Sequence, residues 1–167
     1  MPSGIVSRYI LQDHLATEVA RLYSNEFKEP FFVAVGSHEP FDIASATGNM
    51  KIELKFESTP VRTGNVAIEF WNTDLDAPSA ILGTKATHWL HIVPEGTGLI
   101  CIEHNVDRLR RLVVEAGVVK WNGRNSLCKI IPLETFKKHA KRCFVFHSRF
   151  YSELMASTGA VVERSAA

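Results

Sequence analysis

Three segments between Phe41 and Asn72 alternate apolar and polar residues with a period of two, which is typical of half-buried β-strands. The segments are FDIAS at 41–45, KIELKFE at 51–57 and VAIEFW at 66–71. Turn signals containing Gly48 and Gly64 separate them. We therefore predict three strands, each with one apolar and one polar face.

The polar faces of these strands carry the candidate chemistry: Asp42 on the first, Glu53 and Lys55 on the second, and Glu69 on the third. If the three strands are neighbours, these side chains converge on one patch. Carboxylates on adjacent strands can hold a hard divalent cation through oxygen. Residues two apart on a strand lie roughly 6.6 Å apart on one face, so Lys55 can reach a phosphate or water beside Glu53. The alternative is a sheet with one solvated face.

The apolar pattern predicts further elements on both sides of these strands. A 3.6-residue period predicts an amphipathic helix from Ser7 to Phe27, with Ser7 as its cap. After the three strands we expect a short helix at 79–87, strands at 88–94 and 98–103, a helix at 105–116, a peripheral hairpin with strands at 118–121 and 126–132, and a helix at 133–142.

Composition places the chain among ordinary globular proteins. The 167 residues are enough for one domain with a real core, and 46% hydrophobic and 22% charged residues are usual values. We expect no membrane span, because no run of 18 apolar residues occurs, and no signal peptide. The three cysteines are widely spaced, which favours reduced thiols over disulfides or a zinc site.

Charge is distributed unevenly along the chain. Residues 1–103 carry 13 acidic against 7 basic side chains, a net −6, whereas residues 104–149 carry 3 against 11, a net +8. A metal-dependent phosphodiesterase could use both parts, because acidic groups attract the cation and basic groups attract the phosphate backbone. The alternative is a solvated basic surface without a partner.

The order of Asp42, then Glu53-Leu54-Lys55, resembles the PD-(D/E)xK nuclease signature, with the strand-turn-strand context of that superfamily. One departure is that Phe41, and not a proline, immediately precedes the aspartate; Pro40 lies one step earlier. The segment AIEFWNTDLDAPSAILGTKATHWLHIVP, residues 67–94, is also similar to small nucleases of phages and mobile elements, although Ala80 replaces the glycine of their turn.

This resemblance implies an α/β fold, a restriction-endonuclease-like core with a mixed sheet flanked by helices. The core would span about 8–104, followed by a basic hairpin and helical extension over about 105–155 and a frayed tail. It implies a DNA endonuclease or exonuclease that hydrolyses phosphodiesters with Mg²⁺, for which Mn²⁺ can substitute. Asp42, Glu53 and the Leu54 carbonyl would bind the metal, and Lys55 would position the attacking water. Glu69 and the helical Glu18 are additional candidate ligands.

The expected partner is DNA, with a homodimer left open, in the cytoplasm of a bacterium or a phage-infected cell. The expected DNA-binding residues are Lys85, Arg108, Arg111, Lys137, Lys138 and Lys141. Two other functions remain open: a non-catalytic DNA-binding or phage structural module on the same fold, and a protein-interaction domain. A nucleophilic Ser/His/Asp or Cys/His site assembled in space also stays open, although no local motif supports it.

Overall fold

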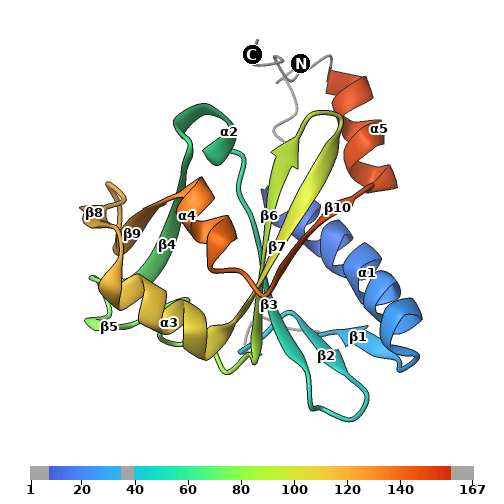
Figure 1. Cartoon of the computed structure of the whole chain (residues 1–167), viewed down its shortest axis with the longest axis horizontal. Helices are drawn as coiled ribbons and strands as arrows, with labels where there is room; N and C mark the ends of the chain where they lie inside the picture. The colour runs from blue at the N-terminus through green and yellow to red at the C-terminus, as the bar shows by residue number, and fades with distance from the viewer. Residues whose placement is uncertain (1–7, 35–39, 159–167) are drawn as a thin grey trace.

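The computed structural model describes residues 8–34 and 40–158 and has a mixed α/β architecture with two sheets (Figure 1). The larger sheet has six strands in the order β1-β2-β3-β6-β7-β10. It is mixed because β3 and β6 run parallel whereas its other neighbours are antiparallel. Its strands are β1 (Phe31–Val33), β2 (Ile43–Ser45), β3 (Lys51–Phe56), β6 (His88–Glu95), β7 (Gly98–Asn105) and β10 (Arg142–Phe146).

The smaller sheet is antiparallel, in the order β5-β4-β9-β8. Its strands are β4 (Asn65–Asn72), β5 (Ala77–Pro78), β8 (Val118–Trp121) and β9 (Ser126–Pro132). The prediction that β4 lies in one sheet with β2 and β3 is therefore wrong. A short helix, α2 (Pro60–Thr63), ends at Gly64 in the left-handed conformation with φ 65°, and this cap redirects the chain into the second sheet.

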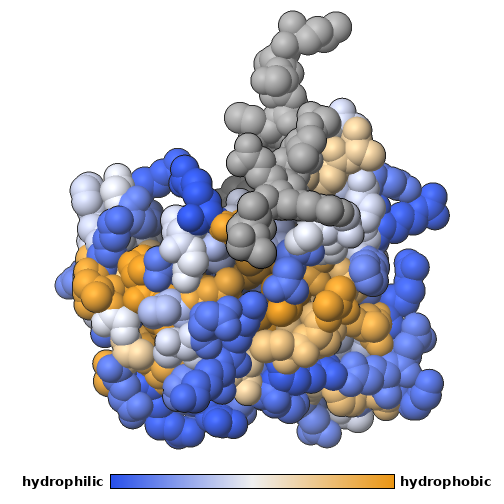
Figure 2. Space-filling view, turned by 45° about the horizontal axis from the view of Figure 1, so that its top comes forward, coloured by the Kyte–Doolittle hydropathy of each residue, from blue (hydrophilic) through white to orange (hydrophobic). Residues whose placement is uncertain are grey.

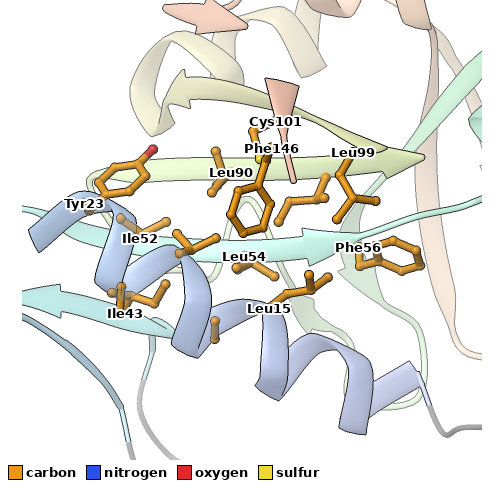
Figure 3. Packing of buried hydrophobic residues seen from close by; sticks show 14 of the residues in the cluster. Leu15, Tyr23, Ile43, Ile52, Leu54, Phe56, Leu90, Leu99, Cys101 and Phe146 are labelled. Carbon is orange, nitrogen blue, oxygen red and sulfur yellow. The ribbon is translucent and has the colours of Figure 1, made fainter. Parts of the chain in front are cut away.

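Two helices, α1 (Arg8–Phe27) and α5 (Arg149–Thr158), join the core on one face of the larger sheet. The predicted helix is confirmed, although its proposed cap Ser7 lies outside the described residues. Leu11, Leu15 and Val19 recur every four residues and are buried. They pack on the inward side chains of β2, β3 and β6, as Figure 3 shows for Leu15, Ile52 and Leu54 among others.

The opposite face of the larger sheet forms a second core with the smaller sheet and with α3 (Val106–Glu115) and α4 (Leu133–Lys138). Trp89 of β6 is 1% exposed in this second core. The α3 helix begins where expected, because the Asn105 side chain accepts hydrogen bonds from the N–H groups of Asp107 and Arg108. Glu53 and Lys55 lie on the face of β3 that is turned away from α1 and toward this second core.

Three further expectations need correction. The helix expected at 79–87 does not form: residues 80–83 are turns and the rest is irregular, because Ala80 adopts a positive φ of 42° that a right-handed helix excludes. The hairpin at 118–132 is not peripheral on both strands, since β9 lies inside the smaller sheet and only β8 forms an edge. The helix expected at 133–142 ends at Lys138, and Arg142 already belongs to β10, which forms an edge of the larger sheet.

Figure 2 shows apolar residues gathered in a band across one face, with hydrophilic residues around it. Large exposed apolar side chains include three on the edge strand β8, Val118, Val119 and Trp121. Within residues 8–34 and 40–158, no helix has the length and apolar character needed to cross a bilayer.

Candidate functional site

Strand pairing brings Asp42 and Glu53 together. Asp42 immediately precedes β2, and its N–H donates to the Ile52 carbonyl at 2.9 Å, which continues the β2–β3 ladder by one bond. Its Oδ2 then accepts the Leu54 N–H at 2.6 Å. A side chain therefore takes the place of the next ladder bond, and the carboxylate is held beside the Glu53-Leu54-Lys55 segment.

The Leu54 backbone faces Asp42, just beyond the first residue of β2. In a strand the N–H and C=O of one residue point to the same side, and the Leu54 N–H points to Asp42. The Leu54 carbonyl therefore projects toward that side as well. This geometry places one backbone oxygen, in addition to the two carboxylates, at the end of the β2–β3 pair.

The electrostatics of Asp42 reflect its burial and its neighbour. Burial, followed by the negative charge of Glu53, raises the pKa of Asp42 to about 6. The Leu54 N–H and the Lys55 ammonium oppose this shift, and Asp13 on α1 adds to it. A positive ion beside the pair would favour the ionised form.

Glu53 is held through both of its oxygens. Oε1 lies 2.7 Å from the Lys55 Nζ, and Oε2 accepts the Thr84 hydroxyl at 3.2 Å. Lys55 also lies over the Trp89 ring, with its Nζ 5.8 Å from the centroid. Lys55 is 31% exposed and Glu53 14%, so the pair lies at the boundary between core and solvent.

A buried hydrogen-bond chain lies next to this pair. Trp89 Nε1 donates to His91 Nδ1 at 3.3 Å, so the proton of neutral His91 is on Nε2, which donates to Glu57 Oε2 at 3.0 Å. Glu57 also accepts the N–H of Ala67 on β4 at 3.3 Å. The chain ties the two sheets together beside Lys55. The period-two spacing of β3 could have identified Glu57, but no local signal connects it with His91.

The two additional candidate ligands lie elsewhere. Glu69 is on β4, in the smaller sheet, and accepts a short hydrogen bond from the Ser79 hydroxyl. Glu18 accepts the Phe150 N–H at 3.3 Å, in the first turn of α5, so it joins α1 to α5. The same junction contains a ring stack of His14 on Phe150, with 3.8 Å between the ring centroids.

The donor set of the Asp42 edge is composed of oxygen, which suits Mg²⁺ or Mn²⁺. Mg²⁺ is commonly bound by one or two protein carboxylates, with waters and substrate phosphates completing its shell. In the described ranges, no three His, Cys, Asp or Glu side chains lie close enough to hold a metal ion together. Asp42 and Glu53 thus form a pair that neither Glu69 nor Glu18 joins in this arrangement.

The predicted DNA-binding residues fall into two groups. Lys137 is paired with Glu95 and Glu134, at 3.5 and 3.4 Å, and Lys141 lies 3.0 Å from the buried Glu103. The other four are exposed and form no ion pair with any residue in the described ranges: Lys85, Arg108, Arg111 and Lys138. Lys85 directly follows Thr84, and its N–H donates to the Pro40 carbonyl at 3.3 Å, so it flanks the Asp42–Glu53 pair.

Comparison with known proteins establishes no family. No protein-family model and no curated protein matches the sequence. Among solved structures, the fold is similar to the bacterial homing endonuclease I-Ssp6803I, with 16% sequence identity and a TM-score of 0.43, over 69% of this chain and 80% of that one. A similarity of this size does not establish a shared family or activity, so the resemblance to PD-(D/E)xK nucleases stays a prediction.

Proposed function

We propose that this protein is a DNA nuclease, an endonuclease or exonuclease that hydrolyses phosphodiester bonds with Mg²⁺, or with Mn²⁺ in its place. The observation that carries the proposal is the convergence of Asp42, Glu53 and Lys55 at the end of the β2–β3 pair. Two carboxylates, a backbone oxygen and an ammonium group at one strand end suit the binding of a divalent cation next to a phosphate.

Each residue has a distinct proposed role. Asp42, Glu53 and the Leu54 carbonyl hold the cation, which when bound polarises the phosphate and lowers the pKa of water. Lys55 orients the attacking water and stabilises the negative charge that grows on the phosphate oxygens. Its Nζ is held by the ion pair with Glu53 and lies over the Trp89 ring, so it would be within reach of a phosphate bound beside Glu53.

DNA is the proposed substrate because exposed basic side chains accompany the acidic pair. Lys85 flanks Asp42 and Glu53, and Arg108 and Arg111 lie on α3, whose Arg110 contacts the 79–86 segment. Exposed Arg and Lys side chains give a sequence-independent attraction to the phosphate backbone. Glu69 and Glu18 stay second-tier candidates for a third carboxylate, and neither contacts Asp42 or Glu53 in this arrangement.

The deciding experiment is a cleavage assay on duplex, single-stranded and branched DNA with and without Mg²⁺. Asp42→Asn and Glu53→Gln should each abolish Mg²⁺-dependent cleavage. Asp74→Asn, in the exposed loop between β4 and β5, is the matched control and should cleave like the wild type. If the wild type binds DNA but cleaves none of the substrates, the protein is a non-catalytic DNA-binding module. If it neither binds nor cleaves, the proposal is wrong.

A further inference from the structure

Residues 79–86, here called the 79–86 loop, run between the two sheets and contact the carboxylates of both. At its start, the Ser79 hydroxyl donates to Glu69 on β4. Near its end, the Thr84 hydroxyl lies 3.2 Å from Glu53 Oε2 on β3 and 2.9 Å from the Pro40 carbonyl. A single loop thus supplies a hydroxyl group to two of the predicted site carboxylates.

Backbone hydrogen bonds fasten the loop at both ends. The Ser79 and Ile81 N–H groups donate to the Phe70 and Glu69 carbonyls of β4, at 3.0 and 3.2 Å. At the other end, the Lys85 N–H donates to Pro40 at 3.3 Å, two residues before Asp42. Within the loop, Ile81 is fully buried in the core between the sheets. The 79–86 loop is therefore held in place by hydrogen bonds at both ends and by the packing of Ile81.

Arg110 on α3 closes the loop from outside. Its Nε donates to the Ile81 carbonyl at 3.0 Å and its Nη2 to the Thr84 carbonyl at 2.8 Å. Asp107, one turn earlier on α3, lies 3.2 Å from Arg110 Nη1 and orients the guanidinium. The planar guanidinium of Arg110 thus donates to two carbonyls three residues apart, those of Ile81 and Thr84. These two bonds fix the backbone conformation that directs the Thr84 side chain toward Glu53.

We infer that Thr84 is a positioning residue of the proposed metal site and that Arg110 acts through it. Thr84 is 7% exposed and touches both segments that carry the carboxylates: Pro40, before Asp42, and Glu53 itself. Its hydroxyl shares one proton between the Pro40 carbonyl at 2.9 Å and Glu53 Oε2 at 3.2 Å, while Lys55 binds Oε1, so both oxygens of Glu53 have a partner. Groups that hydrogen-bond to ligating carboxylates typically change metal affinity roughly 10- to 100-fold.

This inference rests on the proposed function, so its test measures metal binding directly. Calorimetric titration of the purified protein with Mg²⁺ and Mn²⁺, without DNA, gives a dissociation constant for each variant. Thr84→Val removes the hydroxyl and keeps the shape of the side chain, and it should weaken binding roughly 10-fold or more. Thr84→Ser restores the hydroxyl and should bind like the wild type. Thr63→Val, at an exposed hydroxyl in α2, is the matched control and should change nothing.

Arg110→Met tests the second half of the inference. It should weaken metal binding in the same direction as Thr84→Val, and the double variant should be no worse than the weaker single variant, because both changes act on one contact. Equal affinity of Thr84→Val and wild type would overturn the inference while leaving the proposed function intact. A wild type that binds neither Mg²⁺ nor Mn²⁺ would instead overturn the proposed function, and the inference with it.

Discussion

His104 on β7 is a buried histidine. Neither of its ring nitrogens has a hydrogen-bond partner in the described part of the chain. It is 1% exposed and packs on the Phe136 ring at 4.2 Å. Burial lowers the pKa of His104 from 6.5 to about 4; electrostatic interactions with His91, His139 and Arg108 add to this shift, and Glu103 opposes it. The neutral ring is therefore the form that the fold accepts.

The first prediction concerns acid stability. In the unfolded chain His104 is protonated below about pH 6.5, whereas in the folded protein it is protonated only below about pH 4. The stability from this residue is present above pH 6.5 and falls toward pH 4, by about 3 kcal/mol. His104→Leu should flatten urea-unfolding stability over that interval. The exposed His147→Leu serves as control, and an equally steep loss in His104→Leu would contradict the prediction.

The second prediction separates chemistry from binding at Lys55. Lys55→Met removes the ammonium group and keeps the apolar stem that lies against Trp89. The charge of Lys55 is proposed to act mainly in the transition state, so turnover should fall roughly 100-fold or more while DNA affinity changes little. Single-turnover cleavage and filter binding measure the two quantities. A parallel loss of both would make Lys55 a phosphate contact only.

At the scale of elements, Glu103 joins α1, β7 and β10 through one buried carboxylate. It accepts the Tyr23 hydroxyl at 2.6 Å, Arg142 Nε at 2.6 Å and Lys141 Nζ at 3.0 Å. Burial raises the pKa of Glu103, but these hydrogen bonds outweigh it and hold the pKa below its usual value. Arg142 also lies over the Tyr23 ring at 5.3 Å, so the cation has a buried anion and an aromatic face.

The third prediction follows from this network. Glu103→Gln removes the buried counter-charge of Arg142, which keeps its ion pair with Glu26, and should destabilise the fold by about 1.5–3 kcal/mol, measured by urea unfolding at pH 7. Tyr23→Phe removes one neutral donor and should cost about 1–3 kcal/mol. The surface pair Arg149–Glu153 is the control, because Glu153→Gln breaks an exposed ion pair and should cost about 0.5 kcal/mol or less. A Glu103→Gln variant as stable as wild type would show that the network is not stabilising.

How much of the site was predictable depends on how local its contacts are. Asp42, Glu53 and Lys55 meet because a short turn joins β2 and β3, and the alternating pattern of that hairpin identifies all three. Thr84 reaches Glu53 only after the chain has crossed β4 and returned, so its role has no signature in the neighbouring residues. His91 pairs with Glu57 through the parallel β3–β6 register, which is equally non-local.

The same distinction explains the fold. Each strand from Phe41 to Asn72 follows from its own period-two pattern, and all three formed as expected. The partner of β4 does not follow from that pattern, because its apolar face can pack on any complementary sheet. Ile131 of β9 lies opposite Val66 and both are buried, so a contact across 65 residues decides the pairing.

For the molecule as a whole, the structure divides the basic half into groups that are already paired and groups that are free. Lys137 and Lys141 face Glu95, Glu134 and Glu103, so part of the net +8 of residues 104–149 is used within the protein. Arg108 and Arg111 lie exposed on α3, the helix whose Arg110 holds the 79–86 loop. The proposed grip on DNA therefore depends most on α3.

The fourth prediction tests this through the salt dependence of DNA binding. Each lost phosphate contact reduces the slope of log affinity against log salt by roughly 0.9 for duplex DNA. Arg108→Ala combined with Arg111→Ala should flatten the slope by roughly 1.8 and weaken binding equally for all sequences. Lys137→Ala combined with Lys141→Ala removes the same formal charge but also frees acidic partners, so its slope should change less.

The matched control is Arg21→Ala, exposed on α1 on the other face of the larger sheet. Because none of these residues touches Asp42 or Glu53, cleavage at saturating DNA should survive in every variant. If the lysine pair flattens the slope more than the arginine pair, DNA approaches from the β10 edge and breaks the Lys141–Glu103 pair as it binds.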